Sequence, residues 1–190
     1  ATACAGRQEA EKRRRKERIC KGIIMFTLEL AKKEEVKKCY EIILEGMAFQ
    51  RQQGFTQWTK EYPNKDTISD DVKNEKGYVI KQNGDIAGYM CIDFSKEPAY
   101  DNIKGEWRSD MPYAVVHRMA FDKKYRGIGL SETAFKMIDK LCLEKGIKNI
   151  RVDTDFPNLR MQHILKKNGF VNCSVIMFQG GEKLAFDKLL

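Results

Sequence analysis

The sequence predicts a single mixed α/β domain, and three observations carry this prediction. Its 190 residues, 42% of them apolar, fit one folded domain of common size. Segments with apolar residues at every second position alternate along the chain with segments whose apolar residues recur every three to four positions, and these patterns are typical of strands and helices. The dipeptide Asn83-Gly84 lies between two apolar runs and predicts a β-hairpin.

The first strand begins at Met25, after which apolar and polar residues alternate up to Leu30. A helix that ends near Gly54 follows, with these apolar residues on one face: Val36, Cys39, Tyr40, Ile43, Leu44 and Met47. Residues 55–76 are polar with isolated aromatic anchors, and they predict a loop and a short second helix. A segment of this kind often forms one wall of a binding cleft.

The hairpin turn joins two antiparallel strands, over residues 78–80 and 86–94. A loop over residues 95–111 then leads to a strand over residues 113–121. The remaining elements are a helix around 134–142 that ends at Gly146, a strand over 149–154, a helix around 161–165 that ends at Asn168-Gly169, and strands over 170–178 and 184–189. No internal repeat or linker interrupts this order after Met25.

The formal net charge of +8 is concentrated at the N-terminus, since residues 1–24 hold eight lysines and arginines against three glutamates. This segment offers little apolar surface, which predicts disorder or a solvated helix. Residues 25–190 carry an ordinary surface charge and form the folded domain. The case for a nucleic-acid partner therefore depends on the basic segment alone, and the rest of the sequence does not favour one.

A second interpretation of residues 1–24 is that they are non-native leader, translated from a region upstream of the true start. Lys21-Gly22 requires purine-rich codons that resemble a bacterial ribosome-binding site, and Ile23-Ile24 supplies a spacer before Met25. Under this interpretation the native chain begins at Met25. The intact mass of the protein from its host distinguishes the two alternatives.

Composition argues against a membrane span, a metal site and a disulfide framework. The longest stretch without a charged residue, 168–181, has 14 residues, fewer than the ~18 apolar residues that a spanning helix requires. The six cysteines form no Cys-x-x-Cys pair and have no histidine at zinc-ligand spacing. Scattered thiols of this kind predict reduced cysteines, no bound metal and a cytoplasmic protein.

The segment from Arg126 to Ser131 passes from a strand through two glycines into a helix. Glycines at a helix start let several backbone N–H groups and the positive end of the helix dipole approach an anion, and phosphate suits such a site best. A tight turn also needs glycine without any ligand. A P-loop is absent, and the dinucleotide fingerprint fails because its third glycine would fall at Glu132.

Arg126-Gly127-Ile128-Gly129-Leu130-Ser131 resembles the [QR]-x-x-G-x-[GA] signature of the GNAT acetyltransferase superfamily, with Ser131 in place of the last small residue. A second likeness follows at Asn158 and the pair Gly169-Phe170. The resemblance implies a central, mostly antiparallel sheet of six to seven strands with a splayed strand pair, flanked by about four helices. Acetyl-CoA would lie in the gap of that pair as co-substrate.

The resemblance also assigns cofactor-binding roles. Backbone groups of the central strand would pair with the pantetheine arm, amides of the glycine segment would hold the diphosphate, and one asparagine side chain would bond the pantetheine or its neighbouring backbone. These residues are Met119, Ala120 and Phe121; Arg126, Gly127, Ile128, Gly129, Leu130 and Ser131; and Asn158.

In this family a neutral amine attacks the thioester directly. His117 is the candidate catalytic base, because an ordinary histidine pKa of ~6.5 suits proton removal near neutral pH; the alternative is a histidine hydrogen-bonded in the core. Arg118 is expected on the other face, paired with Asp153 or Glu106. The family's tyrosine acid is excluded because its position holds Leu165, so solvent is the expected proton donor to the CoA thiolate.

The resemblance thus implies an N-acetyltransferase, and the sequence favours a small-molecule amine or amino-acid-like acceptor. Four aromatic residues in the variable loops are expected to line the acceptor side: Trp58, Tyr62, Tyr100 and Trp107. The alternative is a non-enzymatic acyl-CoA-binding sensor. The acceptor, the acyl chain length and the oligomeric state, including a homodimer, stay open.

Overall fold

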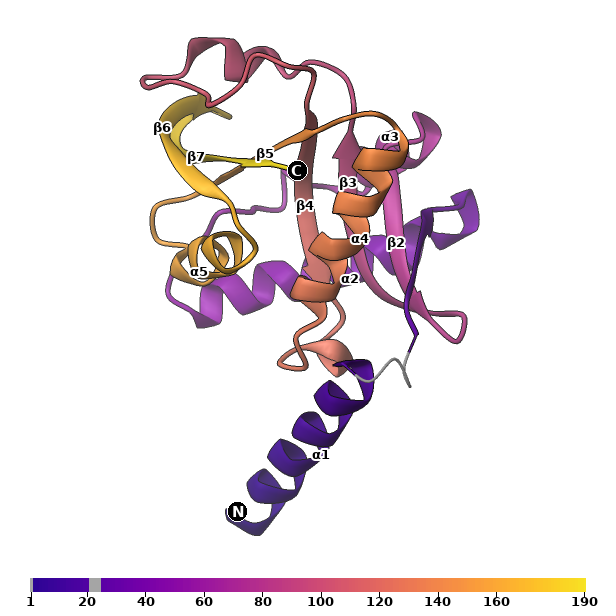
Figure 1. Ribbon diagram of the computed structural model, residues 1–190. Helices are drawn as coiled ribbons and strands as arrows, with labels where there is room; N and C mark the ends of the chain where they lie inside the picture. The colour runs from indigo at the N-terminus through magenta and orange to yellow at the C-terminus, as the bar shows by residue number, and fades with distance from the viewer. Residues whose placement is uncertain (1, 21–24) are drawn as a thin grey trace.

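The computed structural model describes residues 2–20 and 25–190, and its centre is one seven-stranded sheet with the order β1-β2-β3-β4-β5-β7-β6 (Figure 1). The strands are β1 (Thr27–Leu30), β2 (Gly77–Gln82), β3 (Asp85–Asp93), β4 (Ala114–Phe121), β5 (Asn149–Thr154), β6 (Val171–Phe178) and β7 (Gly181–Leu189). Every neighbouring pair except β4 and β5 runs antiparallel. The predicted mixed α/β fold is therefore confirmed.

Helices cover both faces of the sheet. The helices are α1 (Thr2–Cys20), α2 (Val36–Gln52), α3 (Lys65–Lys73), α4 (Leu130–Glu144) and α5 (Leu159–Lys167). Side chains of β2 alternate between the two faces: Tyr78 and Ile80 lie in the core under α4 and α5, whereas Val79 lies in the core under α2 and α3. The strand period read from the sequence thus places the side chains of β2 in two different core clusters, one on each face.

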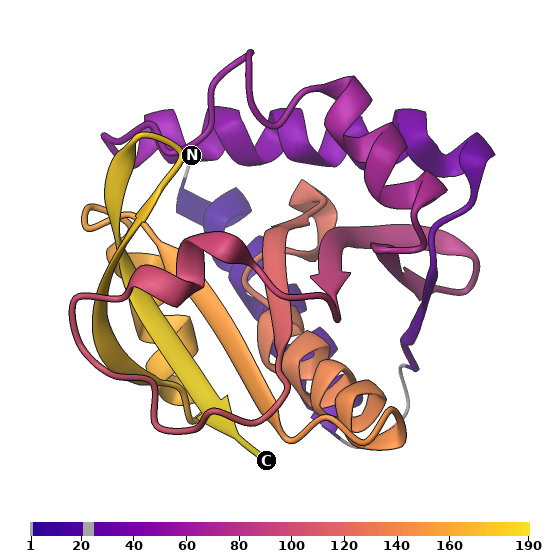
Figure 2. The same ribbon diagram turned by 90° about the horizontal axis from the view of Figure 1, so that it is seen from above.

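The sheet opens between its two parallel strands. β4 and β5 pair at Ala114 with Ile150 and at Val115 with Arg151, and beyond these pairs the strands diverge (Figure 2). α2 crosses over the open end of the gap (Figure 2). The splayed pair expected between residues 113–121 and 149–154 is therefore present.

A β-bulge interrupts β4 in the middle of this opening. Cys91 pairs with His117 and Tyr89 with Ala120, so two residues of β4 lie opposite one residue of β3. The first of the two, Arg118, has φ +54°, in the left-handed region that arginine rarely adopts. The bulge breaks the regular alternation of side chains along β4 and turns Arg118 in a direction that the alternation does not predict.

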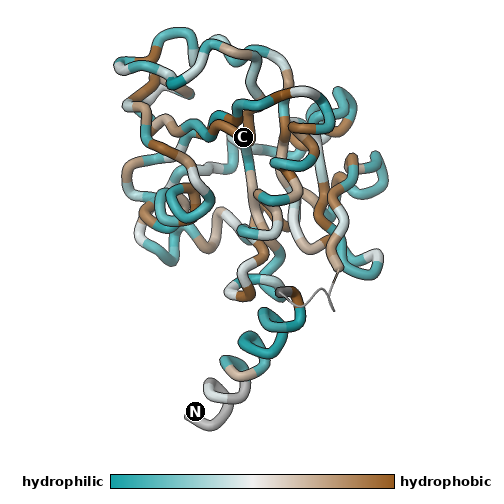
Figure 3. Tube along the Cα trace, in the orientation of Figure 1, coloured by the Kyte–Doolittle hydropathy of each residue, from teal (hydrophilic) through white to brown (hydrophobic). Residues whose placement is uncertain are grey.

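The N-terminal segment forms the helix α1, which projects from the body of the molecule (Figure 1). Its surface is hydrophilic along most of its length (Figure 3). Of the expected alternatives of disorder and a solvated helix, the structure has the helix over residues 2–20. Lys21-Gly22 and Ile23-Ile24, on which the leader interpretation depends, lie outside the described residues.

The last strand begins earlier than expected, at Gly181 instead of residue 184. Gln179 and Gly180 both have positive φ angles, of 52° and 76°, and form a tight hairpin turn that lets Phe178 pair with Gly181.

Within the described parts of the chain, no helix is long and apolar enough to cross a bilayer.

Candidate active site

The glycine segment forms a tight turn at the start of α4. Gly127 and Gly129 have φ angles of +79° and +83°, which glycine adopts without steric cost, and Gly129 is the N-cap residue directly before α4. The side chain of Ile128 between them is 2% exposed and packs into the core. The core thus anchors the turn, while the amides at the helix start remain available to an anion.

A cavity of about 510 Å³ lies between this turn, the open part of β4 and the start of α5. All but one of the predicted cofactor-binding residues line it: Met119, Ala120, Phe121, Arg126, Gly127, Gly129, Leu130, Ser131 and Asn158. Ile128 is the exception, because its side chain points into the core. α2 and the loop after it complete the walls with Phe49, Gln50 and Trp58.

Asn158 holds the start of α5 in place at the edge of this cavity. Its Oδ1 accepts a hydrogen bond from the Met161 amide at 3.1 Å, and its Nδ2 donates to Gln57 Oε1 at 2.9 Å. Gln57 belongs to the loop after α2, whose conformation Gln50 fixes by accepting hydrogen bonds from the Gln57 and Trp58 amides. Sequence reasoning missed both glutamines, because glutamine in a polar segment gives no distinctive signal.

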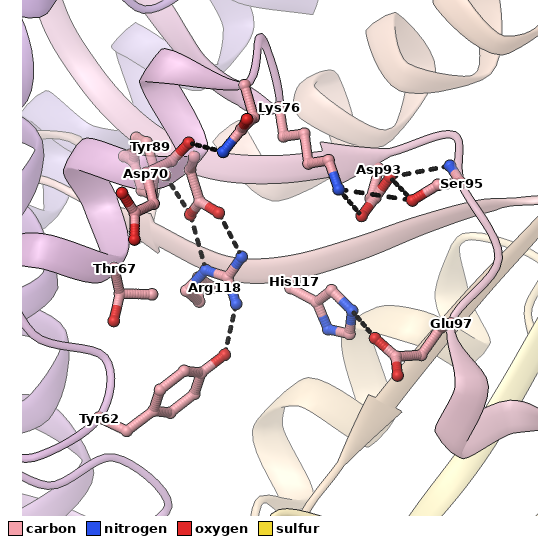
Figure 4. Close-up of polar contacts among 12 residues, drawn as sticks. Tyr62, Thr67, Asp70, Lys76, Tyr89, Asp93, Ser95, Glu97, His117 and Arg118 are labelled. Carbon is pink, nitrogen blue, oxygen red and sulfur yellow. Dashed lines mark hydrogen bonds and ion pairs between the residues drawn. The ribbon is translucent and has the colours of Figure 1, made fainter.

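A smaller hollow of about 80 Å³ adjoins the large cavity. Residues that line both include Trp58, Met119 and Asn158, so the two spaces lie next to each other. The lining of the hollow includes His117 and Asp153 together with Arg118 and Tyr62, and Arg118 contacts Tyr62 while His117 contacts Glu97 (Figure 4). The structure therefore brings the candidate base next to the predicted cofactor residues.

His117 is held between two carboxylates. Its Nδ1 lies 3.6 Å from Asp153 Oδ1. Its Nε2 lies 3.7 Å from Glu97 Oε2 (Figure 4). The ring stacks on Phe178, with 5.6 Å between the ring centroids, and Tyr100 donates a hydrogen bond to Asp153 at 2.8 Å. His117 is thus oriented by its neighbours and also faces the hollow.

The two carboxylates differ in their electrostatics. Burial raises the pKa of Asp153, although His117 and Tyr100 oppose the effect. The contact with His117 lowers the pKa of Glu97. Sequence reasoning missed Glu97, because it lies in a loop where its distance from His117 has no sequence signal.

The prediction that Arg118 pairs with Asp153 or Glu106 is wrong. Its guanidinium binds Asp71 through two hydrogen bonds, from Nε at 2.9 Å and from Nη2 at 2.7 Å, and its Nη1 donates to the Tyr62 hydroxyl (Figure 4). The Tyr89 hydroxyl also donates to Asp71, at 2.7 Å. The bulge in β4 explains the difference, because it turns Arg118 toward α3 and away from Asp153.

The expected aromatic lining is correct in part. Trp58 and Tyr62 line the hollow. Trp107 instead lies over Arg151, with its ring centroid 4.1 Å from the guanidinium carbon, and its indole N–H donates to the Tyr100 carbonyl at 2.9 Å. It therefore supports the loop behind the site. Leu165, at the position of the family's tyrosine, is fully buried.

α1 contributes basic side chains at the glycine turn. A Cβ placed on Gly127 would lie 3.6 Å from Lys12 Nζ, and one placed on Gly129 would lie 3.6 Å from Lys16 Cε. Arg15 lies over the Tyr125 ring at 4.5 Å and contacts Gln82.

Within residues 2–20 and 25–190, no group of three or more His, Cys, Asp or Glu side chains is placed to hold a metal ion.

A glycine turn stands at the start of a helix, opposite a strand that leaves its parallel neighbour. Residues 43–170 match the model of the acetyltransferase (GNAT) family. The chain belongs to this family and is an acyltransferase.

Several solved acetyltransferase structures share this fold. A GNAT-family acetyltransferase from Streptococcus agalactiae is 32% identical, with a TM-score of 0.79, and the match covers 87% of this chain and 95% of that one. The PaiA N-acetyltransferase from Thermoplasma acidophilum, in complex with coenzyme A, is 13% identical, with a TM-score of 0.67 and coverage of 87% and 99%. Aminoglycoside acetyltransferase AAC(6')-Ib, in complex with coenzyme A and kanamycin, is 17% identical, with a TM-score of 0.64 and coverage of 87% and 95%. No curated protein matches the sequence significantly.

Proposed function

We propose that this protein transfers the acetyl group of acetyl-CoA directly to the primary amine of a small-molecule or amino-acid-like acceptor. One observation carries the proposal: the large cavity at the glycine turn lies next to the hollow that is lined by His117 and Asp153. A cofactor bound in the first space can present its acetyl group to an amine in the second. Structures of the same fold with coenzyme A, and one that also holds kanamycin, support this arrangement.

The residues around the large cavity fit acetyl-CoA. Amides from Arg126 to Ser131 would hold the diphosphate at the positive end of α4, where a phosphate is stabilised by N–H groups and the helix dipole. Backbone groups of Met119, Ala120 and Phe121 would pair with the pantetheine arm along the open edge of β4. Ser131 adds a hydroxyl at the helix start, which can donate a hydrogen bond to a phosphate oxygen. When bound, acetyl-CoA supplies the activated acyl group.

The bulge in β4 suits the reacting end of the cofactor. It leaves the backbone around Met119 outside the regular ladder with β3, so its N–H can donate to the thioester oxygen as negative charge develops there. In the reaction, the amine nitrogen forms a bond to the carbonyl carbon and the carbon–sulfur bond breaks. The leaving thiolate takes a proton from solvent, because Leu165 carries no acidic group.

His117 is the proposed base that removes the proton from the incoming ammonium. Asp153 keeps its ring oriented and stabilises the imidazolium that forms. Asp153 is therefore a positioning residue, and Glu97 on the opposite nitrogen contributes in the same way. The proton leaves to solvent after each turnover.

Acetyl-CoA is expected to raise the melting temperature of the wild-type protein, because a ligand that binds only the native state stabilises it by mass action. At a concentration of 100 times Kd, the gain is about 2.7 kcal/mol. Differential scanning fluorimetry with increasing acetyl-CoA measures the shift. An unchanged melting temperature at millimolar acetyl-CoA would contradict the proposed function.

His117→Gln is expected to lower kcat by ~100-fold or more and to leave the Kd of acetyl-CoA unchanged, because it removes a general base without altering the cofactor cavity. Free-thiol release measures kcat, and calorimetry measures the Kd of acetyl-CoA. The matched control is Asp93→Asn, since Asp93 is paired with Lys76 at 2.7 Å outside both cavities; equal losses in the two variants would refute the assignment.

A non-enzymatic acyl-CoA sensor is the second candidate function. Leu165 favours it, because the family's proton donor is missing from α5. Such a protein would show the thermal shift with acetyl-CoA but release no thiol with any amine. The wild-type assay therefore separates the two functions before any variant is made.

A further inference from the structure

The small hollow carries charges of opposite sign on different walls. His117 and Asp153 line one part of it, and Glu97 lies behind His117. The Arg118 guanidinium and the Tyr62 hydroxyl line another part (Figure 4). An acceptor in this hollow therefore meets an acidic and a basic group at once.

We propose that the acceptor is a zwitterion of the α-amino-acid class, with its amino group toward His117 and Asp153 and its carboxylate toward Arg118 and Tyr62. This inference rests on the proposed function and specifies its substrate. Tyr62 and Arg118 thereby become specificity-determining residues.

The hydrogen bonds around Arg118 leave donors for a carboxylate. A guanidinium has five N–H groups, and Asp71 uses one on Nε and one on Nη2, while Tyr62 uses one on Nη1. Because the Tyr62 oxygen accepts from Arg118, its own hydroxyl proton is free to donate. Arg118 and Tyr62 together can thus bind a carboxylate without breaking the pair with Asp71.

The opposite wall suits an ammonium group. Asp153 and Glu97 both lie within 4 Å of His117, so this side of the hollow is acidic. A polyamine or another acceptor with several cationic groups would place one of them against the N–H groups of Arg118, which cannot accept its hydrogen bonds. The arrangement therefore favours one amino group combined with one carboxylate.

The dimensions fit a short head group. The hollow has a volume of about 80 Å³, which favours an amino group and a carboxylate on one carbon over a longer acceptor.

The test compares α-amino acids with the amines that remain when the carboxylate is removed. Thiol release from acetyl-CoA is measured with alanine and ethylamine, leucine and 3-methylbutylamine, and phenylalanine and 2-phenylethylamine, and then with the remaining common amino acids. At least one amino acid is expected to exceed its decarboxylated partner in kcat/KM by tenfold or more. Amines that match or exceed every amino acid would overturn the inference.

Tyr62→Phe tests the carboxylate contact while keeping the ring. We expect kcat/KM for the preferred amino acid to fall about tenfold and that for its amine partner to change less than threefold, which corresponds to the loss of one hydrogen bond to a charged group. The matched control is Tyr78→Phe, because Tyr78 lies in the core on the other face of the sheet and lines neither cavity. Equal losses for both members of a pair would also overturn the inference.

Failure of the inference differs from failure of the proposed function. If acetyl-CoA binds and only amines without a carboxylate are acetylated, the function stands and the zwitterion is wrong. If acetyl-CoA binds and no amine reacts, binding of amino acids to the CoA-bound protein is measured by calorimetry, and the absence of binding overturns the inference. If acetyl-CoA itself does not bind, the proposed function is wrong.

Discussion

Gly129→Glu is expected to abolish the thermal shift with acetyl-CoA. The new side chain would stand at the start of α4, where the diphosphate is proposed to bind, and its carboxylate would repel the phosphates and compete for the same amides. Binding should weaken beyond the millimolar range. Fluorimetry and calorimetry with acetyl-CoA measure the loss.

The substitution also strains the backbone, because Gly129 has a φ angle of +83°. A residue with a Cβ in this region costs ~1–2 kcal/mol. Gly84→Glu is the matched control: Gly84 has a φ angle of +88°, lies in the β2–β3 hairpin turn and has open space around its Cβ position. Both variants should melt earlier without ligand, but only Gly84→Glu should keep the response to acetyl-CoA. A preserved response in Gly129→Glu would contradict the assignment of the diphosphate site.

Asp71→Ala is expected to lower the free energy of unfolding by ~3–5 kcal/mol, the largest stability effect that we predict. The side chains of Arg118 and Asp71 are 10% and 9% exposed, so removal of the carboxylate leaves a buried guanidinium without its partner. The hydrogen bond from the Tyr89 hydroxyl is lost with the same carboxylate. Equilibrium unfolding in urea measures the change.

The double variant Asp71→Leu/Arg118→Met separates the cost of an unpaired charge from the contribution of the pair. Apolar replacement of both partners is expected to be less destabilising than Asp71→Ala alone, because no buried charge remains. The control is Glu144→Ala on α4, whose partner Lys140 lies 3.7 Å away in an exposed pair that contributes little. A single variant as stable as this control would show that the buried pair is not important for the fold.

The elements of the fold could be predicted from sequence because each has a local signal. The alternation from Met25 to Leu30, the helical face of residues 36–47 and the Asn83-Gly84 turn specify strands, a helix and a hairpin without tertiary information. The mostly antiparallel sheet and the splayed pair were instead implied by the resemblance that the glycine segment carries, because parallel pairing between distant strands leaves no local pattern.

The direction of the Arg118 side chain and its partner could not be predicted from the sequence, for a physical reason. Regular alternation on β4 sets the direction of each side chain, and the bulge at Arg118 changes it. Its partner Asp71 lies on α3, in a segment whose composition suggests an exposed helix. Glu97 and Gln57 were missed similarly, since loops bring them to the site through contacts that depend on the complete fold.

The opening between β4 and β5 has a consequence for backbone dynamics. Beyond Val115, β4 no longer pairs with β5. The peptide groups on that edge therefore lack the interstrand hydrogen bonds that protect amide hydrogens in the rest of the sheet from exchange with water. A pantetheine arm in the gap would act as a surrogate strand. Deuterium uptake at residues 116–121 should therefore slow on cofactor binding, while uptake in the hairpin of β6 and β7 stays the same.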